Sequence, residues 1–258
     1  MCIRDRFTSL VFIATIVLTV YIPSTQGYFN LGETMVYTSA IVLGPFEGAL
    51  VSGLGSMLAD MILAPHYAPA TTIIKGLEAL IVGLLYEKLS KMSLKALRTI
   101  ILTLGVLLSI LITYLGISYY SGEVSLGPDI NITVWGSGTT LSVSPVNVVI
   151  GSELWFAFGA IVFIIIMLAS QRAPSHIIPL IISIFGGGVI MVSGYFIYEV
   201  YILYAGIIQS SCSLNEAILL ASYEIPFNVM QVLIGMIVGI PLIMRLKMIG
   251  YGIREQEH

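Results

Sequence analysis

Long apolar stretches separated by short polar turns make up most of this 258-residue chain. A helix needs about 20 apolar residues to cross a bilayer, and the stretches approach that length often enough to predict eight helices. The apolar residues run on unbroken rather than alternating, so the pattern favours an all-α, polytopic membrane protein over a β-barrel. The helices are expected at residues 7–22, 33–43, 48–63, 71–85, 97–119, 152–170, 177–204 and 226–246.

Two segments fall outside this pattern. Residues 120–151 are polar and rich in Gly, Ser and Thr, with alternating apolar residues at 130–134 and 140–143. Such alternation predicts a short external hairpin or an ordered loop. Residues 1–6 are polar, and we expect them to be a truncated natural start or a sequence scar. Residues 7–258 are then expected to form a single integral membrane domain.

Composition agrees with the helix pattern. Hydrophobic residues make up 57% of the chain and charged residues only 10%, and the mean hydropathy is +1.00. A soluble domain carries roughly 25% charged residues, because its surface must be solvated. The composition therefore excludes a soluble enzyme, a nucleic-acid binder and a disordered chain.

The positions of the cations predict an orientation. Positive charges concentrate in the cytoplasmic loops of membrane proteins. With both termini placed in the cytoplasm, ten of the eleven Lys and Arg residues fall inside, and Lys75 is the exception. We therefore expect a multi-pass protein of the cell membrane with both termini cytoplasmic.

Charged residues on the third and fourth predicted helices need an explanation. Asp60, Lys75 and Glu78 would each cost roughly 2.5–3.5 kcal/mol if they were central and unpaired. Lys75 and Glu78 are three residues apart and share a helix face. Asp60 and Lys75 both lie toward the outer ends of neighbouring helices, so an Asp60–Lys75 ion pair is also expected. The Asp60–Lys75 pair could be a structural link between two helices or part of a functional site.

A second polar group lies on the last two predicted helices. Tyr195, Tyr198 and Glu199 fall within about one turn, and Glu199 has no neighbouring cation in sequence. Asn228 and Gln231 are one turn apart and face the same way just inside a helix start. Two amides in this position can read the edge of a flat heterocycle, or they can hydrogen-bond a neighbouring helix. The external position of all these groups favours a substrate pocket open to the outside.

Motifs for nucleotide hydrolysis, nucleophilic catalysis and metal binding are missing from the sequence. It has no G-x-x-x-x-G-K-[ST], G-x-S-x-G or H-E-x-x-H pattern. Its two cysteines and three histidines are scattered and match no metal-ligand spacing. We expect neither an enzyme nor a protein that needs a metal or cofactor.

Several short motifs match a known family in order and spacing. They lie at 27–33 (GYFNLGE), 44–48 (GPFEG), 55–60 (GSMLAD), 67–71 (YAPAT), 75–78 (KGLE), 188–199 (GVIMVSGYFIYE) and 226–231 (PFNVMQ). In these stretches the chain resembles the S component of energy-coupling factor (ECF) vitamin transporters, in the branch associated with riboflavin and hydroxymethylpyrimidine uptake.

The resemblance implies a six-helix membrane core that binds a vitamin at its outer face. It also implies partners, namely a transmembrane coupling (T) subunit and two ABC-type ATPase subunits. The pair of helices within 97–170 would then be an insertion with an external loop at 120–151. Carried over residue by residue, the resemblance selects the substrate-binding residues Asn30, Tyr67, Lys75, Glu78, Tyr195, Glu199, Asn228 and Gln231.

A second class of function remains open at this stage. A proton- or ion-coupled secondary transporter acting alone would use Asp60, Glu78 and Glu199 as relay carboxylates. Many such transporters contain an inverted repeat, which this sequence lacks.

Overall fold

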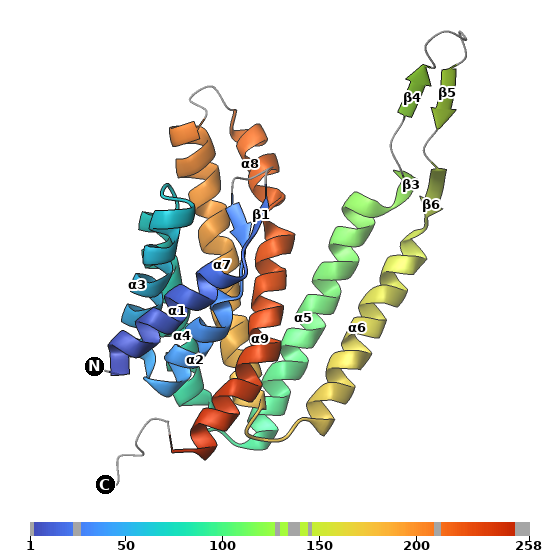
Figure 1. Cartoon of the computed structure of the whole chain (residues 1–258). Helices are drawn as coiled ribbons and strands as arrows, with labels where there is room; N and C mark the ends of the chain where they lie inside the picture. The colour runs from blue at the N-terminus through green and yellow to red at the C-terminus, as the bar shows by residue number, and fades with distance from the viewer. Residues whose placement is uncertain are drawn as a thin grey trace. The chain divides into compact units, whose positions relative to one another are not determined.

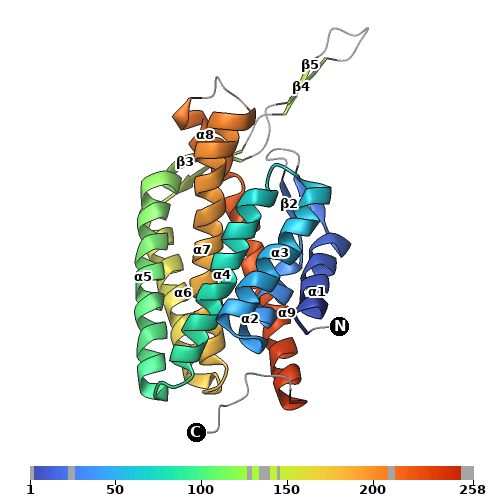
Figure 2. The same cartoon turned by 90° about the vertical axis from the view of Figure 1, so that its left-hand side faces the viewer.

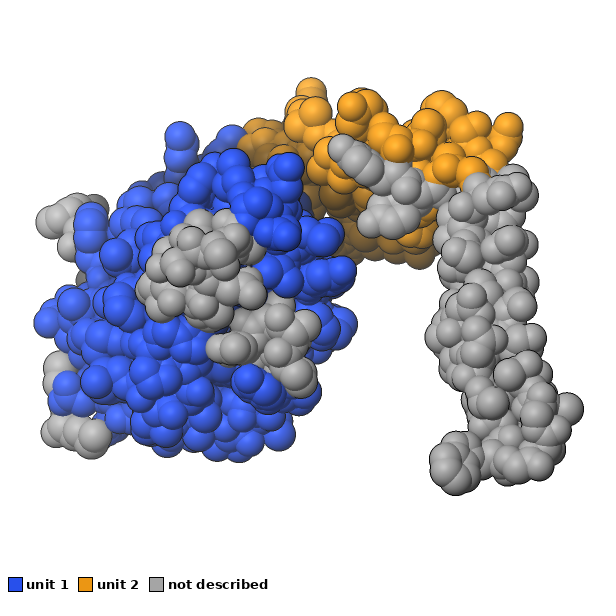
Figure 3. Space-filling model, turned by 90° about the horizontal axis from the view of Figure 1, so that it is seen from above, with its two compact units in different colours: residues 1–92, 174–258 blue, residues 93–173 orange. Residues whose placement is uncertain are grey.

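The computed structural model describes residues 3–22, 27–126, 130–133, 140–143, 146–208 and 213–250. The chain divides into two compact units, which Figure 3 distinguishes by colour. Unit 1 consists of Met1–Met92 and Pro174–His258, and unit 2 consists of Ser93–Ala173. The predicted helix pair within 97–170 lies inside unit 2.

Unit 1 is a helical bundle with one small hairpin (Figures 1 and 2). Helix α4 packs along both α3 and α7, while α2 packs against α9 and α3. The elements of unit 1 are α1 (Ile3–Val17), β1 (Val20–Ile22), β2 (Gly27–Phe29), α2 (Gly32–Val42), α3 (Pro45–Leu63), α4 (Ala68–Leu89), α7 (Ile178–Tyr198), η1 (Glu199–Ile208), α8 (Leu214–Ser222) and α9 (Ile225–Met248).

Six helical stretches in the described part of the chain are long and apolar enough to cross a membrane. They are Pro45–Leu63, Ala68–Leu89, Leu94–Ser118, Ser152–Arg172, Ile178–Tyr204 and Leu214–Met248. The sequence predicted eight crossing helices. The difference lies in α1 and α2, which have 15 and 11 residues and so extend only about 22 Å and 16 Å. The all-helical, multi-pass class is confirmed.

The first helix ends five residues earlier than predicted. Helix α1 stops at Val17, and Val20–Ile22 forms β1, which pairs antiparallel with β2. β-Branched residues at 19, 20 and 22 favour extended backbone, and the proline at position 23 disfavours helical geometry at Ile22. At its other end, α1 is tied to α3 by an ion pair between Arg4 and Glu47.

A tight turn brings α2 and α3 together. Gly44 has φ of +93°, a conformation that favours glycine, and Pro45 then starts α3. A Cβ on Gly48 would lie 2.5 Å from Cα of Ala40, so only glycine permits this approach. Further along, Ser39 and Ser52 share a 2.8 Å hydrogen bond between their hydroxyls. The small residues of α3 therefore pack within unit 1.

The predicted helix at 177–204 is interrupted near its end. Helix α7 gives way at Glu199 to η1, a π-helix. π-Helical turns are rare, and they frequently occur at functional sites. The short helix α8 was not predicted. It begins at a capping box in which the Ser213 side chain accepts from the Glu216 backbone and the Glu216 carboxylate accepts from the Ser213 backbone.

Unit 2 is a pair of packed helices extended by strands. Helices α5 (Leu94–Tyr120) and α6 (Ser152–Arg172) are joined by side chain-to-backbone hydrogen bonds, including Ser109 to the Gly159 carbonyl at 2.7 Å. Beyond them, β3 (Gly122–Leu126) pairs with β6 (Val146–Ile150), and β4 (Ile130–Thr133) pairs with β5 (Thr140–Val143). The hairpin predicted from the alternation at 130–134 and 140–143 is confirmed.

Candidate functional site

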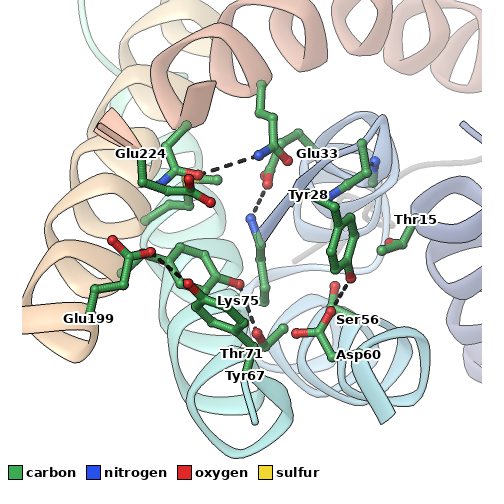
Figure 4. Close-up of a pocket in the computed structure, with 16 residues that line it drawn as sticks. Thr15, Tyr28, Glu33, Ser56, Asp60, Tyr67, Thr71, Lys75, Glu199 and Glu224 are labelled. Carbon is green, nitrogen blue, oxygen red and sulfur yellow. Dashed lines mark hydrogen bonds and ion pairs between the residues drawn. The ribbon is translucent and has the colours of Figure 1, made fainter. Parts of the chain in front are cut away.

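A polar pocket lies inside unit 1, toward the end where α3 finishes and α4 and α9 begin (Figure 4). The cavity has a volume of about 40 Å³, which is room for a few water molecules in the empty protein. The residues that line it are Thr15, Tyr28, Asn30, Gly32, Glu33, Ser56, Asp60, Tyr67, Thr71, Lys75, Met191, Tyr195, Glu199, Glu224, Asn228 and Gln231.

Lys75 stands at the centre of a buried charge cluster. Its ammonium donates to a carboxylate oxygen of Glu33 and, at 3.1 Å, to Oε2 of Glu78. The hydroxyl of Tyr37 donates to Oε1 of Glu78 at 3.0 Å. Both glutamates are fully buried. Buried charges are tolerated when they are paired and hydrogen-bonded. The ammonium of Lys75 meets that condition, whereas Oε2 of Glu33 is buried without a hydrogen-bond partner among the described residues.

The predicted pairing of Lys75 is therefore half right. The Lys75–Glu78 contact along one helix face is confirmed. Among the described residues, the other ion pair of Lys75 goes to Glu33 rather than to Asp60. Glu33 of α2 lies within reach of Lys75 because Gly235 of α9 allows α2 and α9 to pack closely. A Cβ on Gly235 would collide with Cβ of Glu33 and lie 3.0 Å from the Tyr37 ring.

Asp60 has a different partner. Its carboxylate accepts a hydrogen bond from the hydroxyl of Tyr28, which is on β2 (Figure 4). Burial and the nearby charge of Asp60 raise the pKa of Tyr28 above its ordinary value. Tyr28 therefore remains protonated and keeps donating throughout the physiological pH range. The hairpin β1–β2 is in this way held against α3 at the side of the pocket.

Glu199 lies on another side of the pocket, at the first residue of the π-helix. The hydroxyl of Tyr67 donates to its Oε1 at 3.2 Å, whereas its Oε2 is buried and has no hydrogen-bond partner among the described residues. Tyr67 packs edge-on against Tyr195, with ring centroids 6.1 Å apart. Tyr195 in turn shares a 2.9 Å hydrogen bond with Thr71. Figure 4 shows Glu199 and Glu224 on the same side of the pocket.

Two amides complete the lining. Gln231 donates from Nε2 to Oδ1 of Asn228 at 3.4 Å, and its own Oε1 is buried without a hydrogen-bond partner in the described structure. The prediction that these amides face the same way is confirmed. Asn30 lines the pocket too, but its Oδ1 accepts from the backbone N–H of Gly32 at 2.7 Å and so supports the start of α2.

Seven of the eight residues selected from sequence line the pocket, namely Asn30, Tyr67, Lys75, Tyr195, Glu199, Asn228 and Gln231. The eighth, Glu78, contacts Lys75 without lining the pocket. Sequence reasoning missed Glu33, Tyr28 and Glu224. All three lie in motifs at 27–33 or beside 226–231, where they read as loop or helix-start residues. Among the described residues, no three His, Cys, Asp or Glu side chains form a group able to hold a metal.

The fold and pocket define a multi-pass helical membrane protein with a buried polar site rather than an exposed catalytic cleft. The family model described as ECF-type riboflavin transporter, S component, matches residues 7–169. The chain therefore belongs to the family of S components of ECF-type riboflavin transporters, which are substrate-binding membrane subunits and not enzymes.

Other comparisons add less. An uncharacterized protein "in gap 3'region" from Pyrococcus woesei is 42% identical over 71 residues, which are 28% of this chain and 48% of that protein. The chain thus spans about half the length of this curated relative. No solved structure matches the chain. The family match covers α5 and most of α6 and ends before α7, so the pocket residues on α7, η1 and α9 lie outside the matched range.

Proposed function

We propose that this chain is the substrate-binding subunit of an ECF-type ABC importer and captures a vitamin in the unit 1 pocket. The vitamin is riboflavin or a pyrimidine of the thiamine-precursor type. The observation that carries the proposal is the pocket itself. A family of substrate-binding subunits requires one, and here polar side chains from α1 to α4, α7, η1 and the start of α9 converge on one cavity.

The lining supplies the contacts that a flat heterocycle needs. Tyr67 and Tyr195 offer aromatic surface for stacking. Asn228 and Gln231 offer amide donors and acceptors for the ring edges. Gln231 is 5% exposed and its Oε1 has no hydrogen-bond partner among the described residues, so this acceptor is left for a ligand. Leaving such a group unsatisfied in the empty protein is unfavourable, and ligand binding would relieve the penalty.

The pocket opens on the external side in the proposed orientation. Within unit 1, pocket residues lie near the end of α3, the start of α4, the end of α7 and the start of α9. The cations Lys88, Arg245 and Lys247 lie at the opposite ends of α4 and α9. Positive charges favour the cytoplasm, which supports cytoplasmic termini and a pocket that faces outward.

Delivery across the membrane requires other subunits. The sequence contains no G-x-x-x-x-G-K-[ST] motif, so this chain has no P-loop with which to hydrolyse nucleotide. In the proposed assembly a transmembrane coupling subunit and two ABC-type ATPases provide the energy. A stand-alone secondary transporter would instead move its substrate without them.

Binding measured on the purified full chain tests the proposal. We expect at least one of riboflavin, thiamine and hydroxymethylpyrimidine to bind with submicromolar affinity in titration calorimetry. Replacing Asn228→Ala should weaken that binding about threefold to tenfold, because a hydrogen bond is lost. The matched control Asn215→Ala changes an exposed residue of α8 away from the pocket and should leave the affinity unchanged.

Two outcomes would contradict the proposal. The first is that none of the three vitamins binds. The second is that liposomes containing this chain alone accumulate the vitamin in response to a proton or ion gradient. That result would favour the secondary transporter with Asp60, Glu78 and Glu199 as relay groups.

A further inference from the structure

Two carboxyl groups that line the pocket have an unsatisfied oxygen but different partners. Oε2 of Glu33 and Oε2 of Glu199 are both buried without a hydrogen-bond partner among the described residues. Oε1 of Glu33 is paired with the ammonium of Lys75, whereas in the described structure Oε1 of Glu199 accepts from the neutral hydroxyl of Tyr67. The two glutamates are 0% and 1% exposed. Their burial is therefore the same, and the difference between them is a cation.

The described surroundings of Glu199 supply no such cation. The titratable groups that interact with its carboxyl group there are Tyr67, Tyr204 and Glu224. Helix α8 packs against η1, and its titratable residue, Glu216, caps its own helix. The ammonium of Lys75 is engaged by two other glutamates. The segments 23–26 and 209–212, which the structure leaves undescribed, contain neither Lys nor Arg.

A buried carboxyl group without a cation is more stable with a proton than with a charge. Keeping it ionised in a medium of low dielectric costs more than taking up the proton, and a second carboxyl group nearby adds repulsion. Figure 4 shows Glu224 on the same side of the pocket as Glu199. A protonated carboxyl group is a donor through its O–H and still accepts through its other oxygen. Glu33 differs because Lys75 stabilises its charge, so its Oε2 stays an acceptor.

We infer that Glu199 binds the ligand in its protonated form, in which Oε2 donates a hydrogen bond to an acceptor of an uncharged heterocycle. Oε1 of Glu199 continues to accept from Tyr67. Donors of the same ligand meet Oε2 of Glu33 and Oε1 of Gln231, which is also buried without a partner among the described residues. This inference rests on the proposed function and adds a specificity-determining residue that works only with its proton in place.

The affinity for such a ligand is then tied to pH. Loss of the proton from Glu199 replaces a donor with a negative charge that faces an acceptor of the ligand. Binding holds the protonated form, so the affinity is highest while the proton is present and falls as the pH rises through the range in which this carboxyl group ionises.

The affinity of the unmodified chain as a function of pH is the first test. The probe is whichever of riboflavin and hydroxymethylpyrimidine binds more tightly in titration calorimetry. We expect binding to weaken at least about threefold between about pH 7 and about pH 9.5, because fully buried glutamates can stay protonated up to about pH 8–9. The control Glu153→Gln removes an exposed carboxyl group at the start of α6 and should keep the same pH profile.

Two variants then assign the effect to one residue. Glu199→Gln cannot ionise but keeps a donor and an acceptor, whereas Glu199→Ala keeps neither. At neutral pH we expect the alanine variant to bind at least about tenfold more weakly, and the glutamine variant to restore the affinity to within about threefold of the unmodified chain. The glutamine variant should also lose the pH dependence. Titration of the ligand and of Lys75 is common to both proteins, so this comparison corrects for it.

The failures of the two proposals are distinguishable. The inference about the proton is wrong, while the vitamin-binding function stands, if the affinity is constant or rises with pH or if Glu199→Gln keeps the pH dependence. It is equally wrong if the glutamine and alanine variants have the same affinity, or if thiamine, a cation, binds more tightly than both neutral probes. The pH comparison with Glu199→Gln decides the matter even where the alanine variant does not fold. If none of the three vitamins binds, both proposals are wrong.

Discussion

The two units of this protein are built from similar apolar helices but differ in how much of each helix is buried and in where the charged residues lie. In unit 1, 44% of the apolar window of α3 and 50% of that of α4 are buried, whereas in unit 2 the values are 11% for α5 and 6% for α6. Helix α4 carries Lys75 and Glu78 in its interior, and α3 carries Asp60 in its last turn. The charged residues of α5 and α6 lie within five residues of a helix end.

The difference shows what a polar residue in a membrane helix requires. A charge is tolerated where other helices cover it and supply partners, as Glu33 and Tyr37 do around Lys75 and Glu78. Within unit 2, α5 and α6 cover only each other, so the unit leaves most of the surface of each helix uncovered, and a charge there would have no partner from the unit. The site belongs to unit 1 because only a bundle can shield it.

The largest effect is expected from breaking the charge cluster of unit 1. Lys75→Met removes the cation and leaves the carboxylates of Glu33 and Glu78 buried together. Breaking a buried ion pair from one side costs about 3–5 kcal/mol of unfolding free energy. Thermal unfolding of the detergent-solubilised protein measures the loss. The matched change Lys95→Met alters an exposed residue of α5 and should stay within about 0.5 kcal/mol. Equal stability of the two variants would contradict the role given to the cluster.

The next effect concerns unit 2. Ile161 lies near the middle of α6 and is 53% exposed. Ile161→Lys should raise the free energy of membrane insertion by about 2.5–3.5 kcal/mol, because no helix of unit 2 can shield a charge there. An insertion assay that scores the translocated fraction of α6 measures the change, and Ile161→Leu is the neutral control. Normal insertion of the lysine variant would show that this face of α6 is not surrounded by lipid.

The smallest effect tests the close approach of α9 to α2. Gly235→Ala would push a methyl group into Glu33 and Tyr37, and overpacking of this kind costs about 1–3 kcal/mol. Gly239→Ala is the matched control four residues later, where the new methyl would lie 3.5 Å from the Thr34 carbonyl, an ordinary contact. Thermal unfolding should separate the two variants. If both are equally stable, α2 and α9 adjust more freely than the packing indicates.

Much of the helical architecture could be predicted because hydropathy is a local property. The helices around Asp60, Lys75 and Glu199 were found within a few residues of their observed positions at most of their ends. The exceptions depend on tertiary structure. The π-helix at Glu199 and the short helix α8 have no distinctive hydropathy, and α1 ends where extended backbone becomes favourable.

The site was predicted less completely for a related reason. The Lys75–Glu78 contact follows from helical spacing, so it could be read from sequence. The partnership with Glu33 joins residues 42 positions apart and depends on the missing side chain of Gly235, which sequence alone does not connect to either residue. Glu224 was overlooked because it lies at the start of α9, where polar residues are ordinary. Tyr28 was overlooked because strand β2 was not predicted.

The hydrogen bond from Tyr28 to Asp60 also affects how tightly a ligand can bind. A hydrogen bond to a charged group contributes about 1.5–3 kcal/mol. This bond alone would hold a conformation with the hairpin β1–β2 detached from α3 to roughly 0.6–7% of the empty protein. The apparent affinity of a ligand that binds the detached conformation is reduced in proportion to this population. A ligand that itself hydrogen-bonds to Asp60 offsets the free energy lost with the Tyr28 bond. The fraction of molecules with a detached hairpin then rises with the fraction of occupied pockets.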